Sequence, residues 1–311
     1  MNWPNVEFIR VAANGINFEV ATMGSGDRLA LCLHGFPEHA YSWRHQMPLL
    51  AQLGYRVWAP NLRGYGGTDS PRQVAAYRTN TLVEDVAALI RAANPTETLL
   101  IAHDWGAALA WILAMEQPQL IDRLVVLNLP HLACLGRELR RPAQLARFWY
   151  VFLFQLPWLP ESLLRRDQGR ATFDLIRRTS CSPAGFSGEA IEIYRANAAR
   201  SGGLTGMLNW YRAAFRGKDL RRYLRSNAPT IHIPTLLLWG DADVALTLGT
   251  TRDTEKYVPN LTFRVLHGVS HWIQQEVPEA VNAMLEAWLT GKRVPEYDEV
   301  KQLSHKAPSN A

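Results

Sequence analysis

A stretch of ten residues, 99–108, constrains the fold more than any other part of the chain. Residues 99–102 form a short apolar run without helical periodicity, which is typical of a buried strand. Residues 105–117 are rich in Ala, Leu, Ile and Met and end before Pro118, as a helix does. The stretch therefore predicts a strand, a sharp turn and a helix, with Asp104 in the turn.

Asp104 lies at the centre of the spacing that a nucleophile elbow requires. Ala102 and Gly106 stand two residues before and after it, where a tight backbone leaves little room for side chains. The aspartate occupies the position that serine usually holds. A competing interpretation is that Asp104 only caps the helix beginning at Trp105, because Asp is a preferred N-cap residue.

Short apolar segments alternate with helical segments along much of the chain. An antiparallel hairpin is predicted first, around Asn14-Gly15, because this dipeptide readily adopts positive φ. This alternation indicates an α/β protein with a mostly parallel central sheet flanked by helices. Further strands are expected at 29–33, 55–59, 99–102, 124–129, 236–239 and 263–266, and helices at 43–53, kinked at Pro48, and at 81–93.

The strand pattern disappears in one long interval, where Leu, Arg and aromatic residues occur at helical spacing. We expect an inserted helical lid, or cap domain, at 131–229. It divides the core into a first part, 1–130, and a second part, 230–291. The polar tail, 292–311, is expected to be a surface strap or disordered.

Composition excludes several classes of protein. With 311 residues, 48% of them hydrophobic, the chain can bury a large core. Its apolar runs are shorter than the ~18 residues of a membrane span, and residues 1–10 lack the features of a signal peptide. We therefore expect a cytoplasmic protein without integral membrane association.

The same survey gives no reason to expect a cofactor, a metal or nucleic acid. The three cysteines are widely separated, and no His or Cys cluster has metal-ligand spacing. The net charge of +5 comes from residues spread along the chain, which indicates a solvated basic surface rather than a nucleic-acid site. Gly64-Tyr-Gly-Gly67 matches neither a dinucleotide motif nor a P-loop.

Two further residues can form a triad with Asp104. Asp243 follows the expected strand 236–239, and His271 follows the next one. The carboxyl ends of parallel strands meet at one edge of a sheet, so the three side chains can converge there. Asp243 on its own could bind a loop amide and His271 could cap a helix, and Asp241 competes for the acid position. The order nucleophile, acid, histidine is nevertheless that of the α/β-hydrolase arrangement.

Over residues 15–290 the sequence resembles the α/β-hydrolase superfamily and, within it, the soluble epoxide hydrolase family. The core motifs that carry the resemblance are His34-Gly-Phe-Pro-Glu38, Arg63-Gly-Tyr-Gly66, His103-Asp-Trp-Gly106, Gly240-Asp-Ala-Asp243 and Ser270-His-Trp-Ile-Gln274. In the lid, Leu208-Asn-Trp-Tyr-Arg212 and the aromatic segment 148–157 resemble the family's two tyrosine motifs.

The resemblance implies roles for several residues. The family's acid is the final residue of the Gly240 motif, Asp243, and the backbone N–H groups of Phe36 and Trp105 form its oxyanion hole. His34 and His103 are expected to hold the surrounding loops. Asn128 stands where some dehalogenases carry the acid instead, which favours Asp243.

The chemistry explains why a carboxylate stands at the elbow. A carboxylate is ionised near neutral pH and can displace a leaving group from saturated carbon. The product is an ester on Asp104, which water activated by His271 would hydrolyse, with Asp243 orienting the imidazole. No metal or organic cofactor is needed for these steps.

The leaving group decides the reaction. An opened epoxide needs a proton donor, and Tyr150 and Tyr211 are the candidates, although Tyr150 can also be read as a lid-core aromatic. A halide would instead need N–H donors such as the Trp105 indole, which makes a haloalkane dehalogenase the alternative enzyme. A non-catalytic ligand-binding homologue is a third hypothesis.

We therefore expect an epoxide hydrolase that converts small hydrophobic epoxides to vicinal diols, as a monomer or a homodimer. Segment 148–160 is expected to form the apolar wall of a pocket rather than to touch a membrane surface. The expected substrate-binding residues are Phe36, Trp105, Tyr150, Trp210 and Tyr211.

Overall fold

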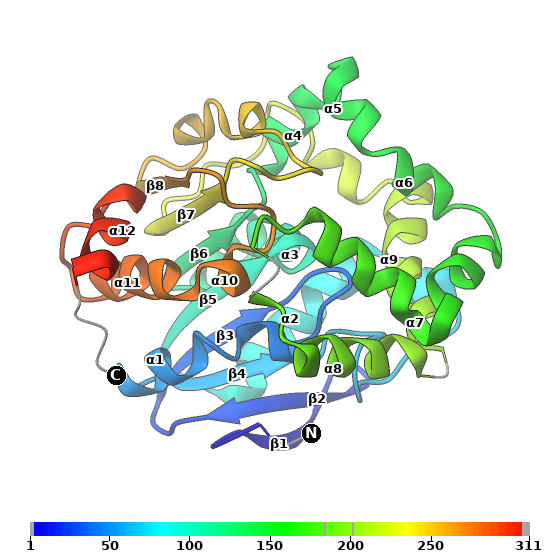
Figure 1. The fold of residues 1–311 in the computed structure, drawn as a ribbon, viewed down its shortest axis with the longest axis horizontal. Coiled ribbons are helices and arrows are strands. Elements are labelled where there is room, and N and C mark those ends of the chain that lie inside the picture. The colour runs from blue at the N-terminus through cyan, green and yellow to red at the C-terminus, as the bar shows by residue number, and fades with distance from the viewer. Residues whose placement is uncertain (1–2, 183–184, 201, 307–311) are drawn as a thin grey trace.

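The fold is built on one eight-stranded sheet, seen in a computed structural model that describes residues 3–182, 185–200 and 202–306 (Figure 1). The strand order is β1-β2-β4-β3-β5-β6-β7-β8. β1 pairs with β2 and β2 with β4 in antiparallel register, and all other neighbours are parallel. The strands are β1 (Glu7–Ala13), β2 (Ile16–Met23), β3 (Arg28–Leu33), β4 (Arg56–Pro60), β5 (Glu97–His103), β6 (Arg123–Leu127), β7 (Thr235–Gly240) and β8 (Leu261–Leu266).

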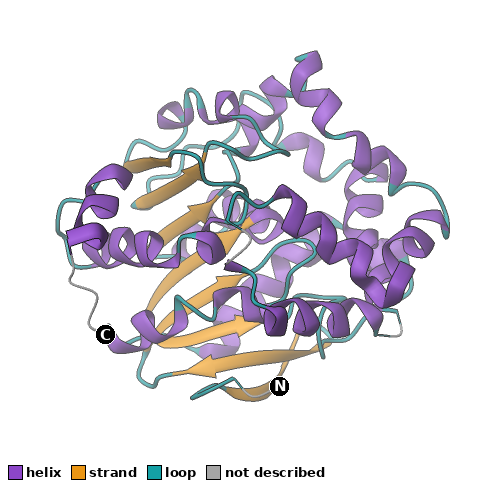
Figure 2. Cartoon of the chain, in the orientation of Figure 1, coloured by secondary structure: helices purple, strands orange, loops and turns teal. Residues whose placement is uncertain are grey.

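Helices cover both faces of this sheet, which is why its central strands are apolar throughout (Figure 2). α1 and α11 lie on one face, with α2 and α3 on the other (Figure 1). The predicted α/β class and mostly parallel sheet are thus confirmed. The helices outside the β6–β7 interval are α1 (Met47–Gln52), α2 (Thr79–Ala93), α3 (Asp104–Glu116), α10 (Ile273–Glu276), α11 (Pro278–Leu289) and α12 (Tyr297–Lys306).

The interval between β6 and β7 is helical in the part of it that the structure describes. In Figure 1 these helices lie beside the sheet, with α5 and α6 at the periphery. Not one helix of the described residues is long and apolar enough to cross a membrane. The interval contains α4 (Leu132–Glu138), α5 (Pro142–Arg147), α6 (Trp149–Leu153), α7 (Leu159–Thr179), α8 (Gly188–Ala199) and α9 (Gly203–Arg216).

Two local predictions are wrong. Pro48 does not kink a helix over 43–53, because α1 begins at Met47 and the proline occupies its first turn, where its missing N–H costs nothing. The tail is not a strap over 297–306, since α12 forms there and buries Tyr297 and Val300. Residues 307–311 of the predicted tail lie outside the described residues.

Candidate active site

The sharp turn after β5 places Asp104 at the sheet's carboxyl edge with φ = +49°. Two glycines make the turn possible. A Cβ on Gly106 would lie 2.6 Å from the carbonyl oxygens of Leu33 and His34, and one on Gly35 would lie 2.3 Å from the Asp104 Cβ. The elbow therefore packs against the β3 loop more closely than any larger residue allows.

The Asp104 carboxylate does not cap α3. The N-cap of that helix is His103, and no side-chain capping bond forms there. Instead, Oδ1 of Asp104 accepts a hydrogen bond from the backbone N–H of Phe36 at 2.7 Å. The capping interpretation is therefore wrong, and the carboxylate is held toward the loop after β3.

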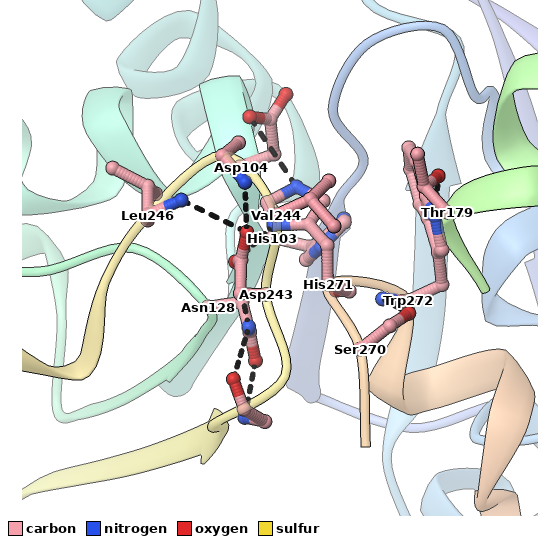
Figure 3. A network of polar contacts seen from close by, with 12 residues as sticks. His103, Asp104, Asn128, Thr179, Asp243, Val244, Leu246, Ser270, His271 and Trp272 are labelled. Carbon is pink, nitrogen blue, oxygen red and sulfur yellow. Dashed lines mark hydrogen bonds and ion pairs between the residues drawn. The ribbon is translucent and has the colours of Figure 1, made fainter. Parts of the chain in front are cut away.

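His271 lies between two carboxylates (Figure 3). Its Nδ1 is 2.6 Å from Oδ2 of Asp243, and its Nε2 is 3.6 Å from Oδ2 of Asp104. The rival acid, Asp241, instead bonds to His267 and to the N–H of Gly268 at an exposed position. The three residues expected to form a triad thus lie together.

Asp243 is fixed from both sides. Oδ2 accepts a second hydrogen bond from Nδ2 of Asn128 at 2.9 Å, while Oδ1 accepts from the backbone N–H groups of Ala245 and Leu246 at 2.7 and 2.9 Å. Each of these donors favours the charged carboxylate. The acid is therefore both oriented and ionised.

Burial and the charges of neighbouring groups have opposite effects on the pKa values of His271, Asp104 and Asp243. Burial disfavours a charged imidazole, but Asp243 and Asp104 outweigh it and raise the pKa of His271 well above its usual value. Burial likewise opposes ionisation of the two carboxyls, yet interactions with His271 lower the pKa of both Asp104 and Asp243. These pKa shifts favour a charged imidazole between two charged carboxylates.

A buried polar network supports the triad, and its extent was not predicted. Nδ1 of His103 lies 2.9 Å from Oε2 of Glu38, and its Nε2 lies 2.9 Å from the backbone oxygen of His271. Glu38 also accepts hydrogen bonds from the side-chain amides of Gln274 and Gln275. His103 thereby links the β3 loop to the histidine loop, as expected of it. No role was predicted for Glu38 or Gln275, because their partners are over 60 residues away.

A cavity of about 340 Å³ opens beside Asp104. Its wall is mostly aliphatic and aromatic, and the lining residues with polar side-chain atoms are Asp104, Trp105, Tyr150, Tyr211 and Arg221. That size and composition are typical of a site for a small apolar molecule. The aliphatic lining was not predicted; it comprises Ala108, Leu129, Leu132, Leu135, Leu139, Leu145, Val151, Ala214, Leu220, Leu224, Ala245 and Leu246.

The two lid tyrosines lie together in this cavity. Their ring centroids are 6.0 Å apart in an edge-to-face arrangement, and Tyr211 also packs edge-to-face on Trp105 at 5.0 Å. Burial, followed by the negative charge of Asp104, raises the pKa of both phenols. Both hydroxyls therefore remain protonated at neutral pH and are available as hydrogen-bond donors.

Two expected substrate-binding side chains lie elsewhere. Trp210 is buried, donates its indole N–H to the backbone oxygen of Arg63 at 2.9 Å, and packs behind Trp105 rather than lining the cavity. The Phe36 ring likewise packs on Tyr211 and Phe154 outside the lining, although its N–H reaches Asp104. Both rings support cavity residues instead of forming the wall.

Among the described residues there is no group of three or more His, Cys, Asp or Glu side chains placed to hold a metal ion. The polar side chains around the cavity are one carboxylate, two phenols, one indole and one guanidinium, and Nε2 of His271 lies 3.6 Å from that carboxylate. This set can attack an electrophilic carbon, donate hydrogen bonds to a leaving group and activate water.

Comparison with known proteins places the chain among related sequences and structures. Residues 31–278 match the family described as alpha/beta hydrolase fold. The chain is 36% identical to the AB hydrolase superfamily protein YfhM of Bacillus subtilis, over 90% of this chain and 96% of that protein. It is also 36% identical to epoxide hydrolase 3 of Xenopus tropicalis, over 91% of this chain and 77% of that protein.

A solved structure shows a similar architecture. The epoxide hydrolase of Bacillus megaterium, crystallised with an inhibitor, superimposes with a TM-score of 0.82 and 28% sequence identity. The match covers 91% of this chain and all of that one.

Proposed function

Because this chain belongs to the alpha/beta hydrolase fold family, we propose that it is an epoxide hydrolase whose nucleophile is Asp104. The observation that carries the proposal is the carboxylate at the elbow, which shares one apolar cavity with two protonated phenols. The similarity to proteins named epoxide hydrolases supports it.

In the first half of the reaction, Asp104 opens the ring. Oδ1 is held by the Phe36 N–H, so Oδ2 attacks a ring carbon while the bond from that carbon to the epoxide oxygen breaks. The bonding electrons move to the oxygen, which takes a proton from the Tyr150 or the Tyr211 hydroxyl. The proton that His271 releases after alkylation restores that phenol. The product is an ester between Asp104 and the substrate carbon.

In the second half, water hydrolyses that ester. Alkylation removes the charge of Asp104, one of the two carboxylates that raise the pKa of His271, so the imidazole loses its proton more readily. Neutral His271 then takes a proton from water as the water attacks the carboxyl carbon. The Phe36 N–H, together with that of Trp105, stabilises the oxyanion that forms on Asp104. The oxyanion then collapses, the bond from the carboxyl carbon to the substrate oxygen breaks, and that oxygen takes the proton of the new carboxyl group. A vicinal diol leaves, and Asp104 is a carboxylate beside protonated His271 again.

The helical interval explains the substrate class. We propose that residues 131–229 are a cap domain over the core, because the cavity takes Asp104 and Leu246 from the core and Tyr150, Tyr211 and Phe215 from the interval. Apolar walls favour alkyl or aryl epoxides, whose affinity would come from burial of apolar surface.

A halide-releasing reaction is the second candidate, since the Trp105 side chain belongs to the cavity wall. The Trp105 ring packs against Tyr211, whose hydroxyl remains protonated. A protonated phenol at this place suits the oxygen of an opened epoxide, which needs a proton, better than a halide, which does not. The contact therefore favours the epoxide reaction.

One assay separates the two reactions. Diol formation and halide release are followed in parallel with a panel of aryl epoxides and bromoalkanes, with the Asp104→Ala variant as blank. Diol without halide is the expected result. Halide without diol would overturn the proposal, and tight ligand binding with no turnover of either class would indicate a binding protein.

A further inference from the structure

The surface around the cavity mouth is unusually apolar. Ten large hydrophobic side chains are exposed in the part of the chain that the structure describes, and six of them belong to α5, α6, the α6–α7 loop and the end of α9. Trp149 is 64% exposed and Trp158 is 72% exposed. We call these six the aromatic collar: Leu145, Trp149, Phe152, Leu156, Trp158 and Phe215.

The collar is continuous with the cavity. Leu145, Phe152 and Phe215 line the cavity and are also exposed, so they form its rim. The ring centroids of Phe152 and Phe215 are 5.7 Å apart in an edge-to-face contact, which joins α6 to α9 across the cavity mouth. Trp149 and Phe152 are three residues apart on α6 and so face the same side. Figure 1 shows α5 and α6 along the outer edge of the molecule.

The collar belongs to a strongly basic part of the chain. Residues 131–229 contain 17 Lys and Arg against 7 Asp and Glu, a formal charge of +10, whereas the whole chain carries +5. Two of these cations lie at the collar, and two more are exposed farther along α7. Arg221 lines the cavity, and Arg216 donates to the backbone oxygen of Gln155 beside Leu156. Arg165 and Arg166, on the first turns of α7 after Trp158, are exposed.

We propose that the aromatic collar binds the surface of an anionic lipid bilayer. Segment 148–160, which was expected to form a pocket wall rather than to touch a membrane, would then do both. Tryptophan favours the boundary between headgroups and acyl chains, where its ring is partly in lipid and its N–H stays wet. Arginines around exposed apolar residues add attraction to anionic headgroups. This is peripheral binding of a folded surface and requires no spanning helix.

Charge argues against a second copy of the chain as the occupant. A symmetric dimer through the collar would bring two segments of charge +10 together, and like charges facing each other oppose association. An anionic bilayer neutralises the same charge. Binding to the bilayer involves the collar alone. Entry of a lipid-dissolved substrate from the bilayer into the cavity would follow from it, and this consequence rests on the proposed function.

Vesicle flotation of the full chain tests the proposal. The probes are phosphatidylcholine vesicles with and without about one third phosphatidylglycerol, at low and high salt. The wild type is expected to float with the anionic vesicles at low salt and to be released by high salt. The Trp149→Ala/Trp158→Ala double variant, which leaves the cavity lining intact, is expected to bind about tenfold more weakly or worse. Leu303→Ala, at a 68% exposed position on α12, is the matched control and should bind like the wild type.

Three outcomes would overturn the proposal. The first is that the wild type fails to float with either kind of vesicle. The second is that the double variant floats as well as the wild type, with circular dichroism showing that both proteins are folded. The third is that sedimentation without vesicles finds a dimer that only the double variant loses, which would make a second copy the occupant of the collar.

Discussion

Nε2 of His271 lies 3.6 Å from Oδ2 of Asp104, just beyond direct hydrogen-bond distance. The same imidazole is bonded tightly through Nδ1 to Asp243, at 2.6 Å. The asymmetry matches two separate tasks, because Asp104 must remain free to attack carbon while Asp243 keeps the ring in place. His271 is therefore expected to act only in the second half-reaction.

The lid tyrosines give the first prediction. Tyr150→Phe and Tyr211→Phe each remove one donor to the ring oxygen, so each should lower kcat/KM for an epoxide by roughly 10²-fold, and the double variant by more. Tyr55→Phe, a buried tyrosine at the start of β4, is the control and should retain activity. Unchanged epoxide turnover in the double variant would remove the phenols from the mechanism.

The second prediction concerns pH. Asp243 keeps the pKa of His271 raised even after Asp104 is alkylated, and hydrolysis of the ester needs the neutral imidazole. Lowering the pH protonates His271 and slows hydrolysis, so the alkylated fraction of the enzyme during turnover should be larger at pH 6 than at pH 8. Rapid quenching followed by intact-mass measurement checks this. An alkylated fraction that grows with rising pH contradicts the assignment of His271 as base.

Asn128 gives the third prediction. This residue has φ = +45° and donates to Asp243, so Asn128→Gly removes the amide without straining the backbone. Without that donor Asp243 holds the imidazole proton more strongly, so ester hydrolysis should slow about tenfold and its pH profile should shift upward. Asn94→Gly, at the same φ beyond α2, is the matched control. A slower rate with an unshifted profile would indicate a structural role alone.

The elbow gives the fourth prediction. Gly106→Ala places a methyl group 2.6 Å from two carbonyl oxygens of the β3 loop, neither of which belongs to a flexible side chain. The free energy of unfolding should fall by about 1–3 kcal/mol or more. Gly188→Ala is the control, because a Cβ there meets nothing within 4 Å. Denaturant unfolding of the two variants measures the difference.

The sequence was sufficient to predict the sheet and the convergence of Asp104, Asp243 and His271 at its carboxyl edge, because both depend on local signals. Apolar runs mark the strands, and Asp104, Asp243 and His271 each follow one of them. The orientation of the Asp104 carboxylate was harder to predict from the sequence. Whether it caps α3 or faces the Phe36 N–H depends on a loop 68 residues away, which no local pattern describes.

Buried polar partners and packing against distant elements were the least predictable features. Trp210 belongs to a tyrosine motif, yet its indole bonds to Arg63 in a different part of the chain. The α12 helix forms in a polar tail because Tyr297 and Val300 pack on neighbouring elements, and two apolar residues among ten are a weak signal by themselves. Both outcomes depend on tertiary contacts.

The proposed mechanism requires Asp104 to become covalently attached to the substrate. The most direct measurement is the intact mass of the His271→Gln variant after incubation with a reactive aryl epoxide, with the Asp104→Ala/His271→Gln double variant as control. We expect the single variant to gain the mass of one substrate molecule, on the peptide that contains Asp104, and the double variant to gain none. A single variant that forms diol without ever carrying the adduct would contradict the covalent mechanism.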